Sequence, residues 1–156
     1  MANNTIRLEI ITPTKMFYRD DVELLVVKTT KGEEGFMAGH MWARKLLAIG
    51  PLKIREPGAS EMRYGVIAGG YIDVSSTGIM IYTDAAEWDT DIDLKLATDQ
   101  KAAAEKYLKE HKDLPDDDPN IIAVQKGLAR SEARIHAAKR RDGLLKMKNK
   151  PITMIF

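Results

Sequence analysis

Two glycine-containing stretches say the most about this chain: GEEGFMAGHMWARKLLAIGPLKI at 32–54 and VIAGGYIDV at 66–74. The first strings several glycines around a single histidine, His40, and the second is a glycine pair that enters an alternating strand. Neither contains the Gly-Lys-Ser/Thr ending of a phosphate loop or a nucleophile paired with a base. We therefore predict consecutive tight turns in the first stretch, where glycine permits positive φ, and a bulge or strand entry at Gly69-Gly70.

The surrounding sequence, up to about Glu87, has the pattern of a β-domain. Apolar and polar residues alternate in TIRLEII at 5–11, as expected for a strand with one buried face. Further short strands are expected at 22–27, 51–55, 61–67, 71–74 and 79–83. Turn signals such as Pro57-Gly58 separate them. Short strands with glycine-containing turns predict an antiparallel sandwich or barrel.

From Asp89 onward the pattern is helical. A first helix is expected from Ile92 to about His111, with N-caps offered by Asp89, Thr90 and Asp91. Its apolar stripe is expected at Ile92, Leu96, Ala103 and Tyr107. Two prolines then interrupt the helix. Asn120 is the expected N-cap of a second helix, from Ile121 to about Arg141, and Gly143 is its expected end.

Both predicted helices have narrow, alanine-rich apolar faces. They predict an antiparallel hairpin that packs closely but buries little apolar area, so it is held weakly on the sandwich. The final KPITMIF, 150–156, lies beyond the helical pattern and begins a short apolar tail. We expect a frayed end there, with a short strand or a partner-binding peptide as alternatives.

Charge is divided unevenly along the chain. Residues 1–83 hold 10 basic and 9 acidic groups (net +1), 84–118 hold 5 and 12 (net −7), and 119–156 hold 9 and 2 (net +7). An acidic block followed by a basic block suggests two segments that lie against each other or separate to find other partners. The overall charge of +1 argues against a general nucleic-acid binder.

Several other classes of protein are disfavoured by composition. The chain has no cysteine, so disulfides are excluded and no metal site is expected. The first residues lack a basic and apolar signal segment, and no apolar run approaches the length of a membrane span. We expect a protein that is cytosolic or peripheral to a membrane on the cytosolic side.

The most tempting single residues have simple structural interpretations. His40 has no partner nucleophile in the sequence, so we interpret it as a turn histidine that hydrogen-bonds the backbone or packs at a subunit interface. Arg130 and Arg134 lie four residues apart and so project from one helix face, which suits phosphate or a partner's carboxylates. Solvated charge is the simpler interpretation of this pair. The acidic run Asp116–Asp118 lacks the spacing of a calcium loop.

Read together, GEEGFMAGH, LLAIGPLKI, VIAGGYIDV and AAEWDTDID resemble, in this order, the epsilon subunit of bacterial F-type ATP synthases. The resemblance runs from about Thr5 to Ala138. It implies an antiparallel β-sandwich of about ten strands, followed by an antiparallel helical hairpin. The mitochondrial counterpart is less expected, because no transit segment precedes Thr5. We place the sandwich domain at 1–87, the regulatory hairpin at 88–143 and a tail of unknown role at 144–156.

The resemblance implies a non-catalytic subunit of the rotor, with no active site of its own. Such a subunit couples ion translocation to ATP synthesis and restrains ATP hydrolysis through its helices. Its implied partners are the gamma subunit, the c-ring and the alpha and beta subunits, at the cytoplasmic face of the bacterial plasma membrane. The gamma and c-ring interface would include Gly35, His40 and Trp42. The contact to beta would use four basic side chains of the second helix: Arg134, Lys139, Arg140 and Arg141.

Some members of this family bind regulatory ATP between the sandwich and the hairpin. The corresponding residues here are Glu87, Asp93, Arg130 and Arg134, but Leu96 stands where the family motif has arginine. The missing charge-assisted contact costs about 1.5–3 kcal/mol. We therefore expect weak ATP binding at most, and no required cofactor. The alternative functions are a free-standing sandwich adaptor with a helical binding hairpin, or a small nucleotide sensor.

Overall fold

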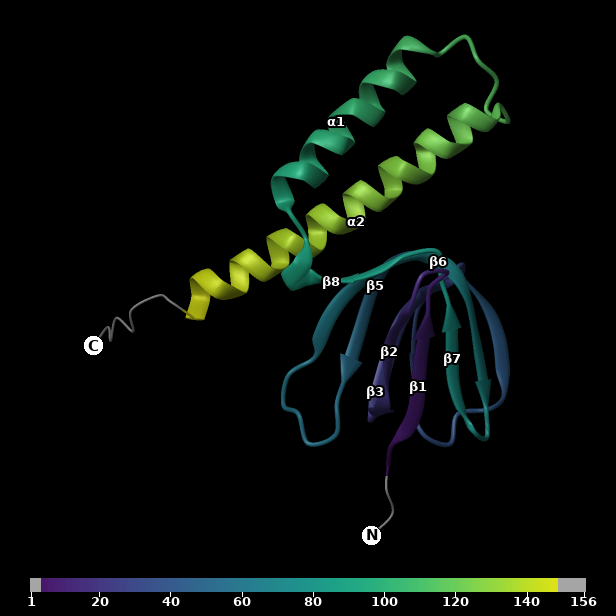
Figure 1. Cartoon of the computed structure of the whole chain (residues 1–156), viewed down its shortest axis with the longest axis vertical. Coiled ribbons are helices and arrows are strands. Elements are labelled where there is room, and N and C mark those ends of the chain that lie inside the picture. The colour runs from purple at the N-terminus through teal and green to yellow at the C-terminus, as the bar shows by residue number, and fades with distance from the viewer. Residues whose placement is uncertain (1–3, 149–156) are drawn as a thin grey trace, which may run out of the picture.

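The structure, a computed structural model, describes residues 4–148 of the 156-residue chain. A β-domain comes first and a helical hairpin stands on one end of it (Figure 1). The strands are β1 (Ile6–Ile11), β2 (Met16–Val22), β3 (Leu24–Thr29), β4 (Gly32–Phe36), β5 (Ala43–Arg55), β6 (Arg63–Ser75), β7 (Gly78–Tyr82) and β8 (Ala86–Trp88). A short 3-10 helix, η1 (Asp89–Asp91), leads into α1 (Leu94–Glu110) and α2 (Pro119–Lys148).

The strands form one sheet in the order β2-β1-β7-β6-β5-β3-β4, with β8 added to β6. The sheet folds over on itself into two layers (Figure 1). Its pairs are antiparallel except β1 with β7, which run parallel. The predicted sandwich followed by a helical hairpin is confirmed, with this parallel pair as the difference. Sequence alternation alone cannot reveal the direction of a neighbouring strand.

Two long strands, β5 and β6, bend across both layers and explain the strand count. Each has 13 residues. Their pairing is interrupted at Ala48 and Gly69, and Gly69 and Gly70 have φ of 80° and 107°. The β5–β6 register is the same on both sides of this gap, so the predicted bulge or strand entry is wrong, and the glycine pair instead forms a bend inside one long strand. If each long strand is counted as two, the eight strands become the expected ten.

The predicted run of tight turns in the first glycine stretch is wrong over its first half. Gly32–Phe36 is strand β4, paired along its length with β3. Only Gly32 and Gly39 in this stretch have positive φ, and Gly35 lies in ordinary strand geometry. The strand forms because Phe36 is fully buried in the sandwich core, and this tertiary packing outweighs the low strand propensity of glycine.

The helix starts also differ from the sequence-based expectation. Asp89 and Asp91 lie in η1, and Asp93 caps α1 by accepting a hydrogen bond from the Leu96 backbone nitrogen at 3.1 Å. Helix α2 begins at Pro119, because the Asp118 carboxylate accepts from the Asn120 nitrogen at 2.9 Å. Aspartate before proline is a favourable start, so Asn120 is the second residue of the helix and not its cap.

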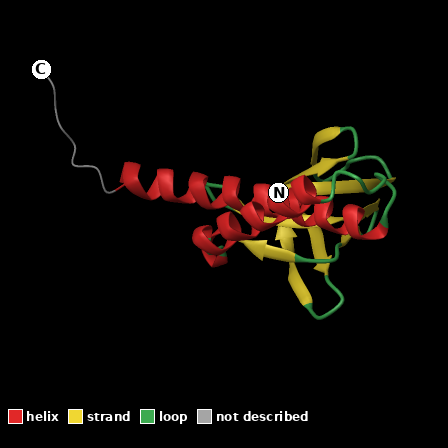
Figure 2. Cartoon of the chain, turned by 90° about the horizontal axis from the view of Figure 1, so that it is seen from above, coloured by secondary structure: helices red, strands yellow, loops and turns green. Residues whose placement is uncertain are grey.

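Helix α2 does not end at Gly143 as predicted but continues to Lys148. A single glycine costs a helix only about 1 kcal/mol relative to alanine. The residues after it, LLKMK, are all good helix formers. Seen from above, α2 extends past the edge of the sandwich (Figure 2). Residues 149–156, which include most of the predicted tail, lie outside the described part of the chain.

The buried residues fall into two clusters. The larger one fills the sandwich between its layers, with Leu8, Phe36, Leu52 and Ile81 fully buried. The smaller one lies between α2 and the outer surface of β6, and consists of Tyr64, Val66, Ile92, Ala137 and Ala138. Leu96, expected in the apolar stripe of α1, is 48% exposed, and the neighbouring Ala97 is buried in its place. Across residues 4–148, no helix has the length and apolar character needed to cross a bilayer.

Candidate functional site

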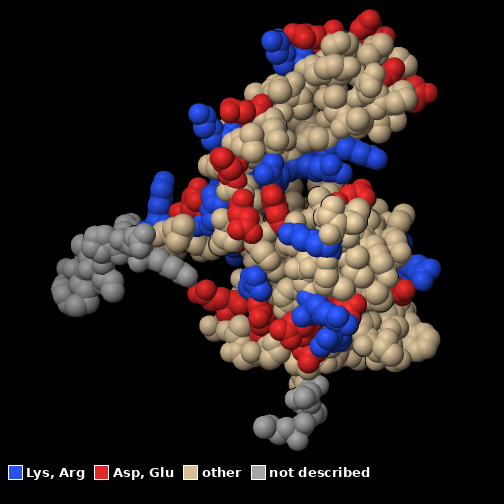
Figure 3. All heavy atoms as spheres, viewed as in Figure 1, with Lys and Arg blue, Asp and Glu red and all other residues tan. Residues whose placement is uncertain are grey.

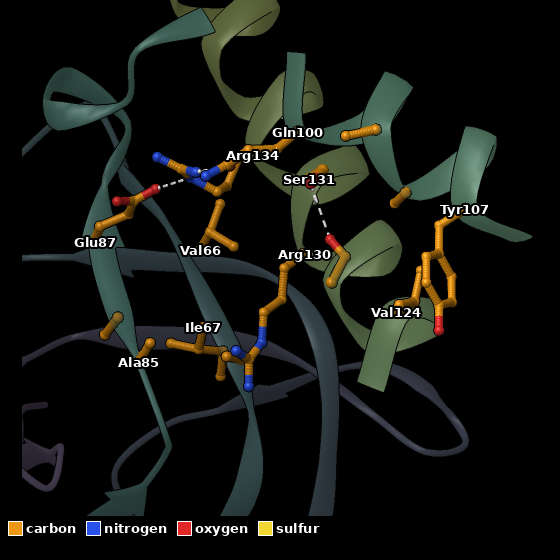
Figure 4. Close-up of a pocket in the computed structure, with 15 residues that line it drawn as sticks. Val66, Ile67, Ala85, Glu87, Gln100, Tyr107, Val124, Arg130, Ser131 and Arg134 are labelled. Atoms are coloured by element: carbon orange, nitrogen blue, oxygen red, sulfur yellow. Dashed lines mark hydrogen bonds and ion pairs between the residues drawn. The ribbon is translucent and has the colours of Figure 1, made fainter. Parts of the chain in front are cut away.

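An open cavity of about 690 Å³ lies between the hairpin and the sandwich. One side is formed by β6 and the segment leading into β8, and the other by the facing surfaces of α1 and α2 (Figure 4). Its walls are mainly apolar, with Val66, Ile67, Tyr107 and Val124 among them. Polar groups come from the sandwich as Glu87 and from the hairpin as Gln100, Arg130, Ser131 and Arg134.

Arg134 is held across this cavity by an acidic partner. Its Nε donates to Glu87 Oε1 at 2.5 Å, and its Nη1 donates to Gln100 Oε1 at 2.8 Å. Figure 4 shows the guanidinium reaching from α2 to the glutamate on the sandwich. A hydrogen bond between two charged groups is about twice as strong as a neutral one. Arg134 therefore ties the second helix to the sandwich and to the first helix.

Arg130, one turn earlier on α2, also points into the cavity (Figure 4). Its Nη2 lies 3.8 Å from Asp84 Oδ2, which is a loose ion pair. Its Nε is buried and has no hydrogen-bond partner. An unsatisfied buried donor costs about 1–3 kcal/mol, so this guanidinium is the group in the cavity best placed to accept an anionic ligand.

The structure brings three of the four predicted nucleotide-site residues together. Glu87, Arg130 and Arg134 all line the cavity. Asp93 does not line it and instead caps α1. Leu96, at the position of the missing arginine, also lies outside the lining. A ligand in this cavity would therefore meet Arg134, which is already paired with Glu87, and Arg130, which has no close partner.

A second set of contacts holds the far part of α2 onto the sandwich. Arg141 donates from Nη1 to the backbone oxygens of Asp89 at 2.6 Å and Ile92 at 2.7 Å. The Arg140 guanidinium lies 4.3 Å from the ring centroid of Tyr64, a cation–π distance. Burial raises the pKa of the Tyr64 hydroxyl, and the positive charge of Arg140 opposes that rise. Lys139, on the same helix, is exposed.

Charges of both signs line this boundary in Figure 3. Three of the four basic residues predicted to meet the beta subunit, Arg134, Arg140 and Arg141, contact the chain's own sandwich or linker. Sequence reasoning missed their partners. Arg141 bonds to two backbone oxygens, which no residue type marks, and Arg140 stacks on a tyrosine of β6. Arg134 bonds to the side chains of Glu87 and Gln100.

The predicted gamma and c-ring residues lie near β4 and the turn after it. His40 Nδ1 lies 2.8 Å from the Met41 backbone oxygen. The centroid of the His40 ring lies 4.8 Å from that of the Phe36 ring. The backbone hydrogen bond expected for this histidine is therefore present. Beside it, Met41 and Trp42 are 81% and 73% exposed. Gly35 is on β4, and Leu46, on β5, is also exposed. Met41 and Trp42 are neighbours in the chain, and adjacent exposed apolar residues mark interaction surfaces.

The described part of the chain contains no candidate metal site. No group of three or more histidine, cysteine, aspartate or glutamate side chains is arranged to hold a metal ion within residues 4–148. The charged groups that line the central cavity are Glu87, Arg130 and Arg134. Their chemistry is that of ion pairing and anion recognition.

The architecture, a β-sandwich carrying a docked helical hairpin, matches a known class of subunit. The family model for the ATP synthase delta/epsilon chain β-sandwich domain matches residues 5–89. The chain belongs to this family, as the resemblance in the sequence predicted. Membership agrees with the prediction that it is an accessory and not a catalytic chain.

Curated relatives extend the match beyond the sandwich. The ATP synthase epsilon chain of Alkaliphilus oremlandii is 40% identical over 105 residues, which is 67% of this chain and 77% of the relative. The epsilon chain of Staphylococcus aureus strain JH9 is 34% identical over 137 residues, covering 87% of this chain and 98% of the relative. The second alignment is long enough to include helical sequence as well as the sandwich.

Solved structures give the same architecture. A chain from the Euglena gracilis mitochondrial ATP synthase, solved with OSCP, F1 and the c-ring, superposes with a TM-score of 0.71 at 25% identity. The match covers 88% of this chain and 82% of that one. A chain from the central stalk and c-ring of the Tetrahymena thermophila enzyme has a TM-score of 0.54 at 16% identity, a likeness of fold alone.

Proposed function

We propose that this chain is the epsilon subunit of a rotary ATP synthase's central stalk, anchored by its sandwich and regulated by its hairpin. The sandwich would bind the gamma subunit and the c-ring through the surface around Gly35, His40 and Trp42. Support comes from family membership and from the exposed apolar side chains beside these residues. The chain would lie on the cytoplasmic face of a bacterial plasma membrane, as a peripheral part of the complex.

The hairpin would act as a brake on ATP hydrolysis by leaving the sandwich and contacting the alpha and beta subunits. One observation carries this proposal: the arginines suited to an acidic partner are engaged by the sandwich side of the junction. The same guanidinium groups cannot bind two partners at once. The sandwich and the beta subunit would therefore compete for Arg134, Arg140 and Arg141, and docking would keep the brake off.

The weakness of the docking contacts supports this exchange. The apolar cluster under α2 is small, and two of its five buried members are alanines. Arg134 and Glu87 are also partly exposed, at 21% and 32% of their side chains, so water screens part of their attraction. An acidic surface that offers carboxylates to the same arginines would need to supply little more free energy than the junction does.

We further propose that no resident cofactor is needed and that regulatory ATP binds weakly. The cavity offers Arg130, but Arg134 is paired with Glu87 and the motif arginine is replaced by Leu96. Leu96 lies outside the lining but one turn before Gln100, which is part of it, so a longer arginine side chain at 96 would reach a ligand in the cavity. A Leu96→Arg variant should therefore tighten ATP binding by about ten- to a hundredfold in calorimetry, the effect of one added charge-assisted contact. Leu96→Gln is the matched control, since it adds polarity at the same exposed position without charge.

The main test is reconstitution with a catalytic head of alpha, beta and gamma subunits that lacks epsilon. The full chain and a version ending at Trp88 should both bind, because both retain the sandwich core. Only the full chain should slow ATP hydrolysis. If both bind and neither inhibits, the hairpin has no braking role. If neither binds, the assignment of these partners is wrong.

A further inference from the structure

A second hollow, distinct from the central cavity, lies under the end of α2. Its volume is about 530 Å³, and it is lined by the start of β6, the end of β8 with η1, and the last turns of α2. Its apolar members are Met62 and Trp88 on the sandwich side and Leu144 and Leu145 on the helix. The two leucines are 41% and 51% exposed, so they present apolar surface that nothing in residues 4–148 covers.

Three arginines and the carboxylates of Glu61 and Asp89 lie around this apolar surface. Arg63 stacks on Trp88, with its guanidinium carbon 3.9 Å from the ring centroid, and its Nη1 donates to Glu56 Oε1 at 2.9 Å. Arg140 stacks on Tyr64 and, within the described part of the chain, has no carboxylate within ion-pair distance. A hollow with apolar walls and a rim of mixed charge fits a peptide that is mainly apolar.

We propose that this hollow, here called the tail groove, binds the chain's own C-terminal segment, residues 149–156. The segment reads NKPITMIF, with four large apolar side chains. Its apolar side chains would cover Leu144, Leu145, Met62 and Trp88.

The position and length of the segment favour this occupant over others. It begins directly after Lys148, where α2 ends, and so within about one helical turn of Leu145. Lys150 precedes Pro151, a combination that disfavours continued helix and favours extended backbone. Eight extended residues reach about 26 Å, far enough for the chain to turn back along the groove. A bound tail would add a contact between α2 and the sandwich beyond those of the arginines.

The absence of cysteine makes a direct test possible, because two engineered thiols would be the only ones in the chain. Thr90→Cys places one on the wall of the tail groove, and Thr153→Cys places the other in the tail. Both changes are nearly isosteric and leave every apolar residue in place. The control pairs Thr153→Cys with Ser76→Cys, an exposed turn residue beyond the opposite end of β6.

The full-length protein is oxidised at low concentration, and disulfide formation is followed with time. The Thr90 pair should close within one chain at least ten times faster than the Ser76 pair. Adding Leu145→Asp should remove that difference, and circular dichroism checks that each variant is folded. Equal rates for the two pairs would overturn the proposal. Faster disulfide formation between chains would also overturn it, in favour of a second copy as occupant.

An optical measurement provides an independent test without new thiols. With Trp42→Phe in place, Trp88 is the only tryptophan. A chain ending at Lys148 should then show red-shifted emission relative to the full chain, because the tail no longer shields the indole. Identical spectra would contradict the proposal. Neither test depends on synthase subunits, so both can succeed or fail independently of the proposed function.

Discussion

The sandwich core and the junction beneath α2 are stabilised by different kinds of contact. The core is a continuous set of large apolar side chains, many with no exposure at all. The junction has a small cluster that includes two alanines, supplemented by arginines that bond to a carboxylate, a ring and two backbone oxygens. Apolar burial stabilises in proportion to area, whereas exposed ion pairs contribute little. Damage to the first region should unfold the domain, while damage to the second should release the hairpin.

The largest effect should come from breaking the core. Leu52→Ala removes a fully buried side chain from the sandwich and should lower the free energy of unfolding by about 2–5 kcal/mol, because it leaves a cavity. Denaturant unfolding followed by tryptophan fluorescence measures this. Leu46→Ala, on the same strand but 65% exposed, should change it by less than about 0.5 kcal/mol. Similar losses for the two variants would contradict the distinction between core and surface.

The bend in β6 should be nearly as sensitive. Gly70 has φ of 107°, and a Cβ atom there would lie 1.8 Å from the Tyr82 backbone oxygen. Gly70→Ala should therefore cost about 2–3 kcal/mol of unfolding free energy, through strain and a forced shift of β7. Gly127→Ala in α2, where nothing lies within 4 Å of the added carbon, should be neutral or stabilising. Thermal unfolding of both variants gives the comparison.

The junction should respond differently from the core. Arg141→Gln removes a charged donor from two backbone oxygens and should weaken hairpin docking by about 1.5–3 kcal/mol. Hydrogen exchange should speed up along α2, while protection of β1, β6 and β7 stays unchanged. Lys139→Gln, an exposed neighbour, is the matched control. Equal loss of protection in the sandwich strands would show that the two regions unfold together.

The smallest effect concerns a polar group inside the sandwich. The Tyr18 hydroxyl is buried without a hydrogen-bond partner, and burial raises its pKa to about 12. The unfolded chain ionises this hydroxyl near pH 10, so it releases its proton first and stability falls as the pH rises from about 10 to 12. Tyr18→Phe should change stability at pH 7 by less than about 1 kcal/mol and should reduce that alkaline loss. Unfolding measured at pH 7, 10 and 12 tests both statements.

Local sequence patterns predicted the elements that depend on periodicity and turns. The first strand and both helices follow from alternation and helical spacing, and the glycine pair at Gly69-Gly70 marked the place of the bend in β6, though not its form. Strand β4 did not follow, because its formation depends on Phe36 reaching a core built from distant segments. The end of α2 was also misplaced, since one glycine is too weak a signal to end a helix of good formers.

The site was predictable in its residues but not in their partners. The spacing of Arg130 and Arg134 indicated one helix face, and both line the central cavity. Nothing in the sequence indicated that Arg134 would bond to Glu87 or that Arg141 would bond to the oxygens of Asp89 and Ile92. Such pairs depend on how the hairpin rests on the sandwich. That placement is set by small side chains such as Ala137 and Ala138.

The central claim is that the sandwich and the catalytic head compete for the same arginines. Glu87→Gln tests it most directly, because it removes the sandwich's hold on Arg134 without altering any arginine. ATP hydrolysis by epsilon-depleted heads would be titrated with the wild-type chain and with this variant. The account predicts inhibition at about fivefold lower concentration, as expected for the loss of about 1 kcal/mol of docking. Unchanged or weaker inhibition by a variant that still binds the head would contradict it.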